Sequence, residues 1–439
     1  MNDFPRKRVA LATLGCKVNQ FESASFQSDL VDHDVEMVPF NQSADLYIIN
    51  TCAVTARAAA QSRQLVRRAL RNNPQARLVV TGCYVQIGSQ EILDIVDQPL
   101  CLVGNGFKKD LVKIALAEDH CDLEMFMGDI RQRREISPIE VRRFGDRTRA
   151  FLKIQDGCDN FCTYCIVPFA RGRSRSLSPD LVLRQVGIFA TQMYREIVVT
   201  GIHTGMYGRD LSPVSGLVDL LGMLVSEYPL RYRISSLDPG EIHQDLLQFM
   251  AEEEMIMPHL HIPLQSGDNR ILKQMNRHYQ REDFAELIAQ IREVLPEAAI
   301  GVDVMAGFPG EDEEAFENTL NLLSDLEVTY LHVFPYSRRP GTMAAEMDEQ
   351  VLKKDKDQRV ARLRELDRVK RKAFYASQLG RTREVLAEDS GRRKDSVLRG
   401  FTDNYVPVRF EADRDVANTV VKVKLETLAE DGVAGSLVR

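Results

Sequence analysis

The chain has 439 residues, of which 44% are hydrophobic, and carries a formal net charge of -7 at pH 7. This length predicts roughly three domains with ordinary packed cores, and the acidic total excludes a surface that is basic throughout, although arginine-rich stretches can attract phosphates locally. No apolar run is long enough to cross a membrane and the N-terminus lacks the pattern of a secretory signal, so we expect a cytoplasmic protein with reduced cysteines and no membrane partner.

The first part of the chain alternates apolar runs with helix-like segments. Three of the apolar runs end in a cysteine, at residues 9–16, 44–52 and 76–83. Strand–helix alternation predicts a parallel α/β sheet, and ligands of such sheets bind at the carboxyl ends of the strands. We therefore expect Cys16, Cys52 and Cys83, the N-terminal triad, to converge on one three-thiolate site. The alternative is that these three cysteines are structural.

Residues 121–145 contain many arginines and few apolar runs, which predicts a linker. A second strand–helix alternation follows it. The six candidate strands of this part span residues 151–157, 196–203, 231–237, 259–267, 300–308 and 330–337. Six strand–helix units are too few for a closed (β/α)8 barrel. We therefore predict a partial (β/α)6 barrel, open on one side to admit a large substrate, with its chemistry at the carboxyl ends of the strands.

Three cysteines with C-x3-C-x2-C spacing lie in the stretch QDGCDNFCTYCIVP: Cys158, Cys162 and Cys165, the core triad. Such a triad could bind zinc with a distant fourth ligand, form disulfides, or hold three irons of a [4Fe-4S] cluster and leave the fourth iron open. No second closely spaced pair completes a zinc site, and a reduced compartment disfavours disulfides. The pattern favours the open cluster, with chance structural cysteines as the alternative. Cys101 and Cys121 belong to neither triad, and we expect both to be small buried residues.

A helix is predicted over residues 349–379, and the composition changes after it. Five short β-like runs then alternate with turn residues up to the end of the sequence. This pattern predicts a small five-stranded β-barrel of the OB-like kind, and such barrels often bind oligonucleotides. A packing or dimerisation module is the alternative.

Nine motifs spread over the chain carry a family resemblance. They read TLGCKVNQFES, NTCAVT, TGCYVQ, LKIQDGCDNFCTYCIVPFARGRSRS, VTGIHTGMYG, LHIPLQSG, VMAGFPGE, HVFPYSRRPGT and GFTDNYV. In these motifs the sequence resembles the methylthiotransferases of the radical S-adenosylmethionine superfamily, most closely the branch that modifies threonylcarbamoyladenosine in tRNA. The resemblance implies a methylthiotransferase domain over residues 5–120, a linker over 121–145, a radical core over 146–375 and a TRAM RNA-binding barrel over 376–439.

The resemblance also implies two [4Fe-4S] clusters. The core triad would hold the cluster that cleaves S-adenosylmethionine, and the resulting radical would remove the hydrogen on C2 of the modified adenine. The N-terminal triad would hold the cluster that carries the sulfur to be inserted, and a second S-adenosylmethionine would supply the methyl group. Residues implied in the S-adenosylmethionine pocket are Tyr164, Thr200, Gly201, Ile202, Ser235, Gln265 and Asp303.

The implied partners are a tRNA substrate, an electron donor such as flavodoxin or ferredoxin, and a sulfur source. Two alternatives keep the chemistry but change the substrate, to isopentenyladenosine in tRNA or to an aspartate of a ribosomal protein. A third alternative is a non-catalytic RNA-binding protein that contains a structural metal.

Overall fold

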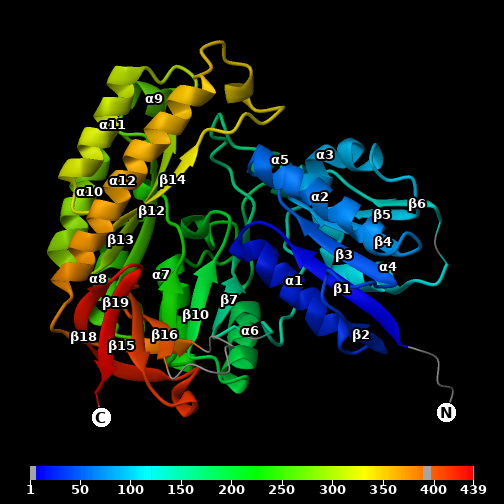
Figure 1. Ribbon diagram of the computed structural model, residues 1–439, viewed down its shortest axis with the longest axis horizontal. Helices are drawn as coiled ribbons and strands as arrows, with labels where there is room; N and C mark the ends of the chain where they lie inside the picture. The colour runs from blue at the N-terminus through cyan, green and yellow to red at the C-terminus, as the bar shows by residue number, and fades with distance from the viewer. Residues whose placement is uncertain (1–5, 120, 146, 389–396, 439) are drawn as a thin grey trace.

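The computed structural model describes residues 6–119, 121–145, 147–388 and 397–438. It consists of an N-terminal α/β sheet, a central barrel built from two sheets, and a small C-terminal β-barrel (Figure 1). This mixed α/β architecture confirms the predicted fold class. Residues 5, 120, 146 and 439, which end predicted domains, lie outside the described residues, and the domain boundaries stay predictions.

The N-terminal part is a parallel sheet with the strand order β2-β1-β3-β4-β5-β6. Its strands are β1 (Lys7–Thr13), β2 (Val35–Met37), β3 (Leu46–Thr51), β4 (Arg77–Gly82), β5 (Leu100–Val103) and β6 (Leu123–Phe126). The sequence pattern predicted β1, β3 and β4 but missed the other three, which are short. β6 occupies residues predicted as linker, because it is an edge strand whose ladder partner is β5.

Four helices connect these strands: α1 (Lys17–Leu30), α2 (Ala56–Asn72), α3 (Cys83–Leu93) and α4 (Leu111–Leu116). The strand order reverses at β1, which has β2 on one side and β3 on the other. In open parallel sheets, ligands bind outside the carboxyl ends of the strands at such a reversal. The sheet therefore places a binding position at the ends of β1 and β3, where Cys16 and Cys52 follow.

The central part contains the six predicted strands as two three-stranded parallel sheets, β11-β10-β7 and β12-β13-β14. The strands are β7 (Arg149–Lys153), β10 (Glu196–Thr200), β11 (Arg231–Ile234), β12 (His259–Gln265), β13 (Ala299–Ala306) and β14 (Tyr330–Pro335). The two sheets meet between β11 and β12, where the Leu237 N–H donates to the His261 carbonyl at 3.0 Å. No ladder joins β7 to β14 among the described strands, so the barrel is open along that seam.

Helices pack around the outside of this barrel, with α10, α11 and α12 forming one flank (Figure 1). They are α6 (Pro179–Thr191), α7 (Leu217–Glu227), α8 (Gln244–Glu252), α9 (Asn269–Gln274), α10 (Arg281–Val294), α11 (Glu313–Asp325) and α12 (Lys353–Ser377). Apolar side chains from the strands and from these helices except α9 form one buried core, and Ile271 of α9 belongs to a smaller neighbouring cluster. Among the described residues, no helix combines the length and apolar composition that a bilayer span requires.

The C-terminal part is a closed barrel with the strand order β15-β16-β17-β19-β18. Its strands are β15 (Thr382–Glu388), β16 (Val397–Thr402), β17 (Pro407–Glu411), β18 (Val420–Ala429) and β19 (Gly432–Leu437). Arg233 of β11 donates to the carbonyls of Asp403 at 3.0 Å and Thr402 at 3.3 Å, and its guanidinium lies 4.9 Å from the Tyr405 ring centre. The turn between β16 and β17 is therefore bound to the central barrel.

Candidate metal centres

The three cysteines of the N-terminal triad follow neighbouring strands of the first sheet. Cys16 and Cys52 come after β1 and β3, and Cys83 follows β4 as the first residue of α3. The turn before Cys16 contains Gly15 at φ +100°, where an added Cβ would lie 2.9 Å from the Cys52 Sγ. Only glycine suits this left-handed, crowded position. The structure thus brings the three predicted ligands together at the reversal of strand order.

The electrostatics of the N-terminal triad suit a cationic metal centre. Burial, followed by the nearby Cys83 and Cys16 thiols, raises the pKa of Cys52 to about 11. Thiolates held this close need a metal to neutralise them. Arg171 donates through Nε to the Cys83 Sγ at 3.2 Å. Hydrogen bonds to the sulfurs tune the potential of an iron–sulfur cluster, so this donor set fits the implied group.

Arg171 also lies at the centre of a buried ion network. It is the last residue of the short helix α5 (Val167–Arg171), and its Nη1 contacts Glu22 at 3.0 Å and Asp156 at 2.9 Å. Lys153 contacts the same two carboxylates at 3.2 and 2.7 Å, and Lys108 contacts Glu22. Three cations against two anions leave one positive charge in excess beside the triad. The network joins the first sheet to the central barrel.

The pKa of Glu22 shows how strongly this network is coupled. Burial raises the pKa, but Arg171 and then Lys108 more than offset that effect, and they hold it well below its usual range. Buried charges of this kind are tolerated only when they are paired. Removal of a single partner is therefore expected to destabilise the contact between the two parts.

The core triad lies in a loop that other segments hold at several points. The Cys158 N–H donates to the Gly172 carbonyl at 3.1 Å, and the Thr163 N–H donates to the Met275 carbonyl at 3.0 Å. The Cys165 N–H turns back to the Cys162 carbonyl at 2.9 Å. The loop therefore holds its three sulfurs in one place, and all eight cysteines of the chain are free thiols.

The core triad also has an arginine beside it. Arg277 donates through Nη1 to the Cys162 Sγ at 3.5 Å and through Nη2 to Asp238 at 2.6 Å. Burial, followed by Cys162, raises the pKa of Cys165 to about 12. The two triads thus share one design, in which three thiols converge and one guanidinium hydrogen-bonds to a sulfur. Both fit a cluster held by three cysteines.

Gly157 positions the core triad, and its replacement gives a first testable expectation. Its φ is +79°, and an added Cβ would lie 1.9 Å from the Arg173 carbonyl oxygen, which is backbone and cannot rotate away. We expect Gly157→Ala to displace Cys158 and to halve the iron content per chain after reconstitution. In the matched control Gly222→Ala, a helical glycine with nothing within 4 Å of an added Cβ, iron content is expected to stay at the wild-type level. Equal iron content in both variants would contradict the expectation.

Two residues implied in the S-adenosylmethionine pocket are suited to a ligand. The pKa of Tyr164 is raised well above its ordinary value by burial and then by Cys162, and its ring lies 6.4 Å from that of Phe308. Gln265 ends β12 at φ +66°, and its Oε1 is buried with no hydrogen-bond partner. An orphaned buried acceptor is rare in folded proteins. It fits a pocket in which a ligand donor completes the hydrogen bond.

Three other implied pocket residues lie at the end of β10: Thr200 is its last residue, and Gly201 and Ile202 follow in the loop. The Thr200 carbonyl accepts from the Ile154 N–H at 2.9 Å, and the Ile202 N–H donates to Gln155 at 3.0 Å. An added Cβ on Gly201 would lie 2.9 Å from Gln155 Oε1. Gln155 also donates to the Gly157 carbonyl at 2.8 Å, so it ties this loop to the core triad.

Ser235 and Asp303 already have partners within the protein. The Ser235 hydroxyl donates to the Val199 carbonyl at 2.8 Å, which caps the end of β10. Asp303 lies in the middle of β13, 3.0 Å from His261 and 3.4 Å from His332. These three side chains have the composition of a metal site, and the second nitrogen of His261 contacts the Ser236 hydroxyl at 2.6 Å.

Cys101 and Cys121, which belong to neither triad, differ in exposure. Cys101 is buried in β5, as predicted. Cys121 is exposed, so the prediction of a buried residue was wrong for it, because it precedes β6 at the edge of the sheet. Neither cysteine joins a triad.

Two family models match the chain. The model of Uncharacterized protein family UPF0004 matches residues 8–104, and that of the Radical SAM superfamily matches residues 152–323. The first range contains the N-terminal triad and the second contains the core triad. The division between them follows the two α/β parts of the fold.

Curated relatives match over nearly the full length. Threonylcarbamoyladenosine tRNA methylthiotransferase MtaB of Bacillus subtilis (strain 168) is 39% identical over 95% of this chain and 93% of its own length. The protein of the same name from Aquifex aeolicus (strain VF5) is 37% identical over 94% and 99%. A tRNA-2-methylthio-N(6)-dimethylallyladenosine synthase of Acetivibrio thermocellus is 32% identical over 99% and 92%.

A solved structure shares the fold. The radical S-adenosylmethionine methyltransferase TsrM from Kitasatospora setae superimposes with a TM-score of 0.56 over 77% of this chain and 75% of that chain, at 14% identity. At this identity the likeness concerns the fold alone.

Proposed function

Because the chain belongs to the threonylcarbamoyladenosine tRNA methylthiotransferase family of radical S-adenosylmethionine enzymes, we propose that it places a methylthio group on C2 of N6-threonylcarbamoyladenosine next to the anticodon of tRNA. The observation that carries this proposal is the pair of cysteine triads, each with an arginine on one sulfur, in a chain similar to such enzymes over nearly its whole length. The lower identity of the dimethylallyladenosine synthase makes that substrate the weaker candidate.

The enzyme uses S-adenosylmethionine and [4Fe-4S] clusters. When bound, these groups supply one-electron cleavage of the sulfonium and the sulfur for insertion. We assign one cluster to Cys158, Cys162 and Cys165 and the other to the N-terminal triad. In this assignment Arg277 and Arg171 each donate a hydrogen bond to a ligand sulfur, and Gln265 and Tyr164 orient S-adenosylmethionine.

The remaining pocket roles follow from the same assignment. Backbone polar groups of Gly201 and Ile202 would hold the amino group of S-adenosylmethionine, while Thr200 and Ser235 fix the strand ends that carry this loop. Asp303 holds His261 and His332 at the inner face of β13. The electron donor is a small redox protein such as flavodoxin or ferredoxin, and a separate sulfur source reloads the enzyme. A reducing cytoplasm suits the eight free cysteines.

Nucleoside mass spectrometry of total tRNA tests this function. A strain without the gene should lose 2-methylthio-threonylcarbamoyladenosine and regain it on complementation. If that nucleoside persists while the isopentenyladenosine derivative disappears, the substrate assignment is wrong and the class of reaction is right. If neither changes, a ribosomal-protein aspartate becomes the substrate to test.

Lys17 is placed to recognise the group that distinguishes this substrate. The threonylcarbamoyl group on N6 carries a carboxylate, and C6, which bears N6, and C2 flank the same ring nitrogen of adenine. Lys17 directly follows Cys16, so its backbone lies about 4 Å from a residue of the N-terminal triad. Its side chain is exposed to solvent, and burial and then Arg233 lower its pKa, while Cys16 and Asp303 act in the opposite direction.

We expect Lys17→Met to lower kcat/KM for this substrate by roughly 10- to 100-fold, the cost of one charge-assisted hydrogen bond. Iron content and S-adenosylmethionine cleavage should stay at wild-type levels. The exposed Lys109→Met is the matched control and should behave as wild type. If Lys17→Met lowers kcat/KM equally for a substrate whose threonyl carboxylate is amidated, Lys17 does not recognise the carboxylate.

A further inference from the structure

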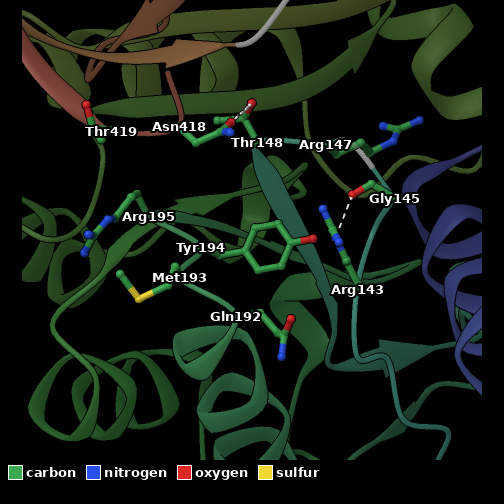
Figure 2. A pocket seen from close by; sticks show the side chains of 10 residues that line it. All are labelled: Arg143, Gly145, Arg147, Thr148, Gln192, Met193, Tyr194, Arg195, Asn418 and Thr419. Atoms are coloured by element: carbon green, nitrogen blue, oxygen red, sulfur yellow. Dashed lines mark hydrogen bonds between the residues drawn. The ribbon is translucent and has the colours of Figure 1, made fainter. Parts of the chain in front are cut away.

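A groove of about 580 Å³ lies where the linker, the central barrel and the C-terminal barrel meet (Figure 2). Three chain segments line it: residues 143, 145, 147 and 148 before β7, residues 192–195 between α6 and β10, and residues 418–419 before β18. Its charged side chains among the described residues are Arg143, Arg147 and Arg195, and Asp146 lies outside those residues. No acidic side chain is among the described residues that line it. We call this feature the arginine groove.

The three arginines of the groove are exposed and lack acidic partners among the described residues. Arg143 donates through Nε to the Gly145 carbonyl at 3.2 Å, and Arg147 lies 5.3 Å from the centre of the Phe151 ring. Neither contact neutralises the charge. By contrast, the neighbouring Arg149 pairs with Glu196 at 3.2 Å and with Glu388 at 2.6 Å. Three exposed cations without an acidic partner among the described residues make a local anion-attracting surface on a chain of net charge -7.

The walls of the groove are fixed by contacts between the parts. The Thr148 hydroxyl donates to the Asn418 Oδ1 at 2.8 Å, as Figure 2 shows, and the Asn418 N–H donates to the Ala387 carbonyl at 2.8 Å. These bonds attach a loop of the C-terminal barrel to the residue before β7. Met193 adds an apolar side chain that is 63% exposed, at φ +63°. A non-glycine residue in this conformation is held there by its surroundings.

The position of the groove indicates the size of its ligand. The groove lies at the start of β7 and β10, whereas the core triad follows the opposite end of β7. The five residue steps from Thr148 to Lys153 span roughly 16 Å in extended conformation. A nucleotide bound at the core triad is too small to reach the groove. A ligand that occupies both positions is an extended polyanion, and guanidinium groups bind phosphate oxygens with two parallel hydrogen bonds.

We propose that the arginine groove binds backbone phosphates of the tRNA stem that adjoins the modified loop. This inference rests on the proposed function, because it takes tRNA as the substrate. The groove contributes affinity and orientation by charge, and it reads no base, since backbone contacts carry no sequence information. The C-terminal barrel supplies one wall of the groove, and its loop is therefore part of the binding surface.

The test uses the full-length, cluster-loaded protein with arginines 143, 147 and 195 all replaced by glutamine. We expect the affinity for full-length tRNA to fall at least tenfold at 150 mM salt. The slope of log Kd against log salt should fall by about 2 to 3, because each lost phosphate contact removes about 0.7 to 0.9. Cleavage of S-adenosylmethionine without tRNA should equal that of wild type, because none of the three arginines touches a triad.

Single variants distinguish a loss of phosphate contacts from misfolding of the triple variant. The exposed Arg195 side chain makes no hydrogen bond, ion pair or ring contact with another described side chain, so Arg195→Gln should fold normally and lower the salt slope by about 0.7 to 0.9. The control is Arg364→Gln, an exposed arginine on α12, which should leave the slope unchanged. A wild-type protein that does not bind tRNA would refute the proposed function. If the wild type binds tRNA and the triple variant keeps the same affinity and slope, the groove inference is overturned. It is also overturned if the triple variant loses binding to an acidic protein while its binding to tRNA is unchanged.

Discussion

Cys52→Ala is expected to abolish formation of the methylthio product while leaving S-adenosylmethionine cleavage intact, whereas Cys162→Ala is expected to abolish both. The reason is structural: the two triads lie in different parts of the fold, and each has its own arginine donor, at Cys83 and Cys162 respectively. Loss of one thiolate from a set of three leaves too few ligands for a stable cluster. Each variant should therefore retain half of the wild-type iron.

Three measurements on each variant separate the two roles: iron per chain, 5′-deoxyadenosine by chromatography, and the modified nucleoside by mass spectrometry. Cys101→Ala is the matched control, because Cys101 is buried in β5 outside both triads. It should retain full iron and full product. If Cys52→Ala forms the normal amount of methylthio product, the N-terminal triad does not take part in sulfur insertion.

Arg171→Met is expected to destabilise the protein by about 3 to 5 kcal/mol, which is the usual cost of leaving buried charges without a partner. The substitution removes the cation that contacts both Glu22 and Asp156, and with it the hydrogen bond to the Cys83 sulfur. Urea unfolding, followed with and without the clusters, measures the loss. The control is the exposed Arg173→Gln, which should stay within about 0.5 kcal/mol of wild type.

The effect of Arg171→Met should depend on pH. In the wild type the pKa values of Glu22 and Asp156 are depressed, so their contribution to stability is present above the unfolded values near 4 and is lost as the pH falls through the folded values. Without Arg171, burial favours the neutral carboxyl groups. The stability difference between variant and wild type should therefore be largest near pH 7 and shrink below about pH 4. A constant difference over this range would mean that packing, rather than charge, explains the loss.

The sequence was sufficient to predict the convergence of the N-terminal triad. Parallel strands end on one edge of a sheet, so a cysteine after each of β1, β3 and β4 must lie near the others. The core triad could be predicted equally well, because its three cysteines lie close together in the sequence. The closed C-terminal barrel could be predicted from its alternation of short strands and turns.

The arginines beside the triads could not be predicted, because their contacts are made across long stretches of chain. Arg171 is 88 residues from Cys83, and Arg277 is 115 residues from Cys162. The only hint was a charged residue that ends an otherwise apolar five-residue helix. The docking of the turn at Thr402 and Asp403 onto Arg233 was likewise hidden, since turn residues usually face solvent.

Helix α5 has a further consequence for how the two sulfur sites work together. It begins two residues after Cys165, and its last residue, Arg171, contacts the Cys83 sulfur. The five residues of this helix correspond to roughly 7 Å along its axis. A shift of α5 would therefore move the core triad and the Arg171 side chain together, so the two triads are coupled through one short rigid element.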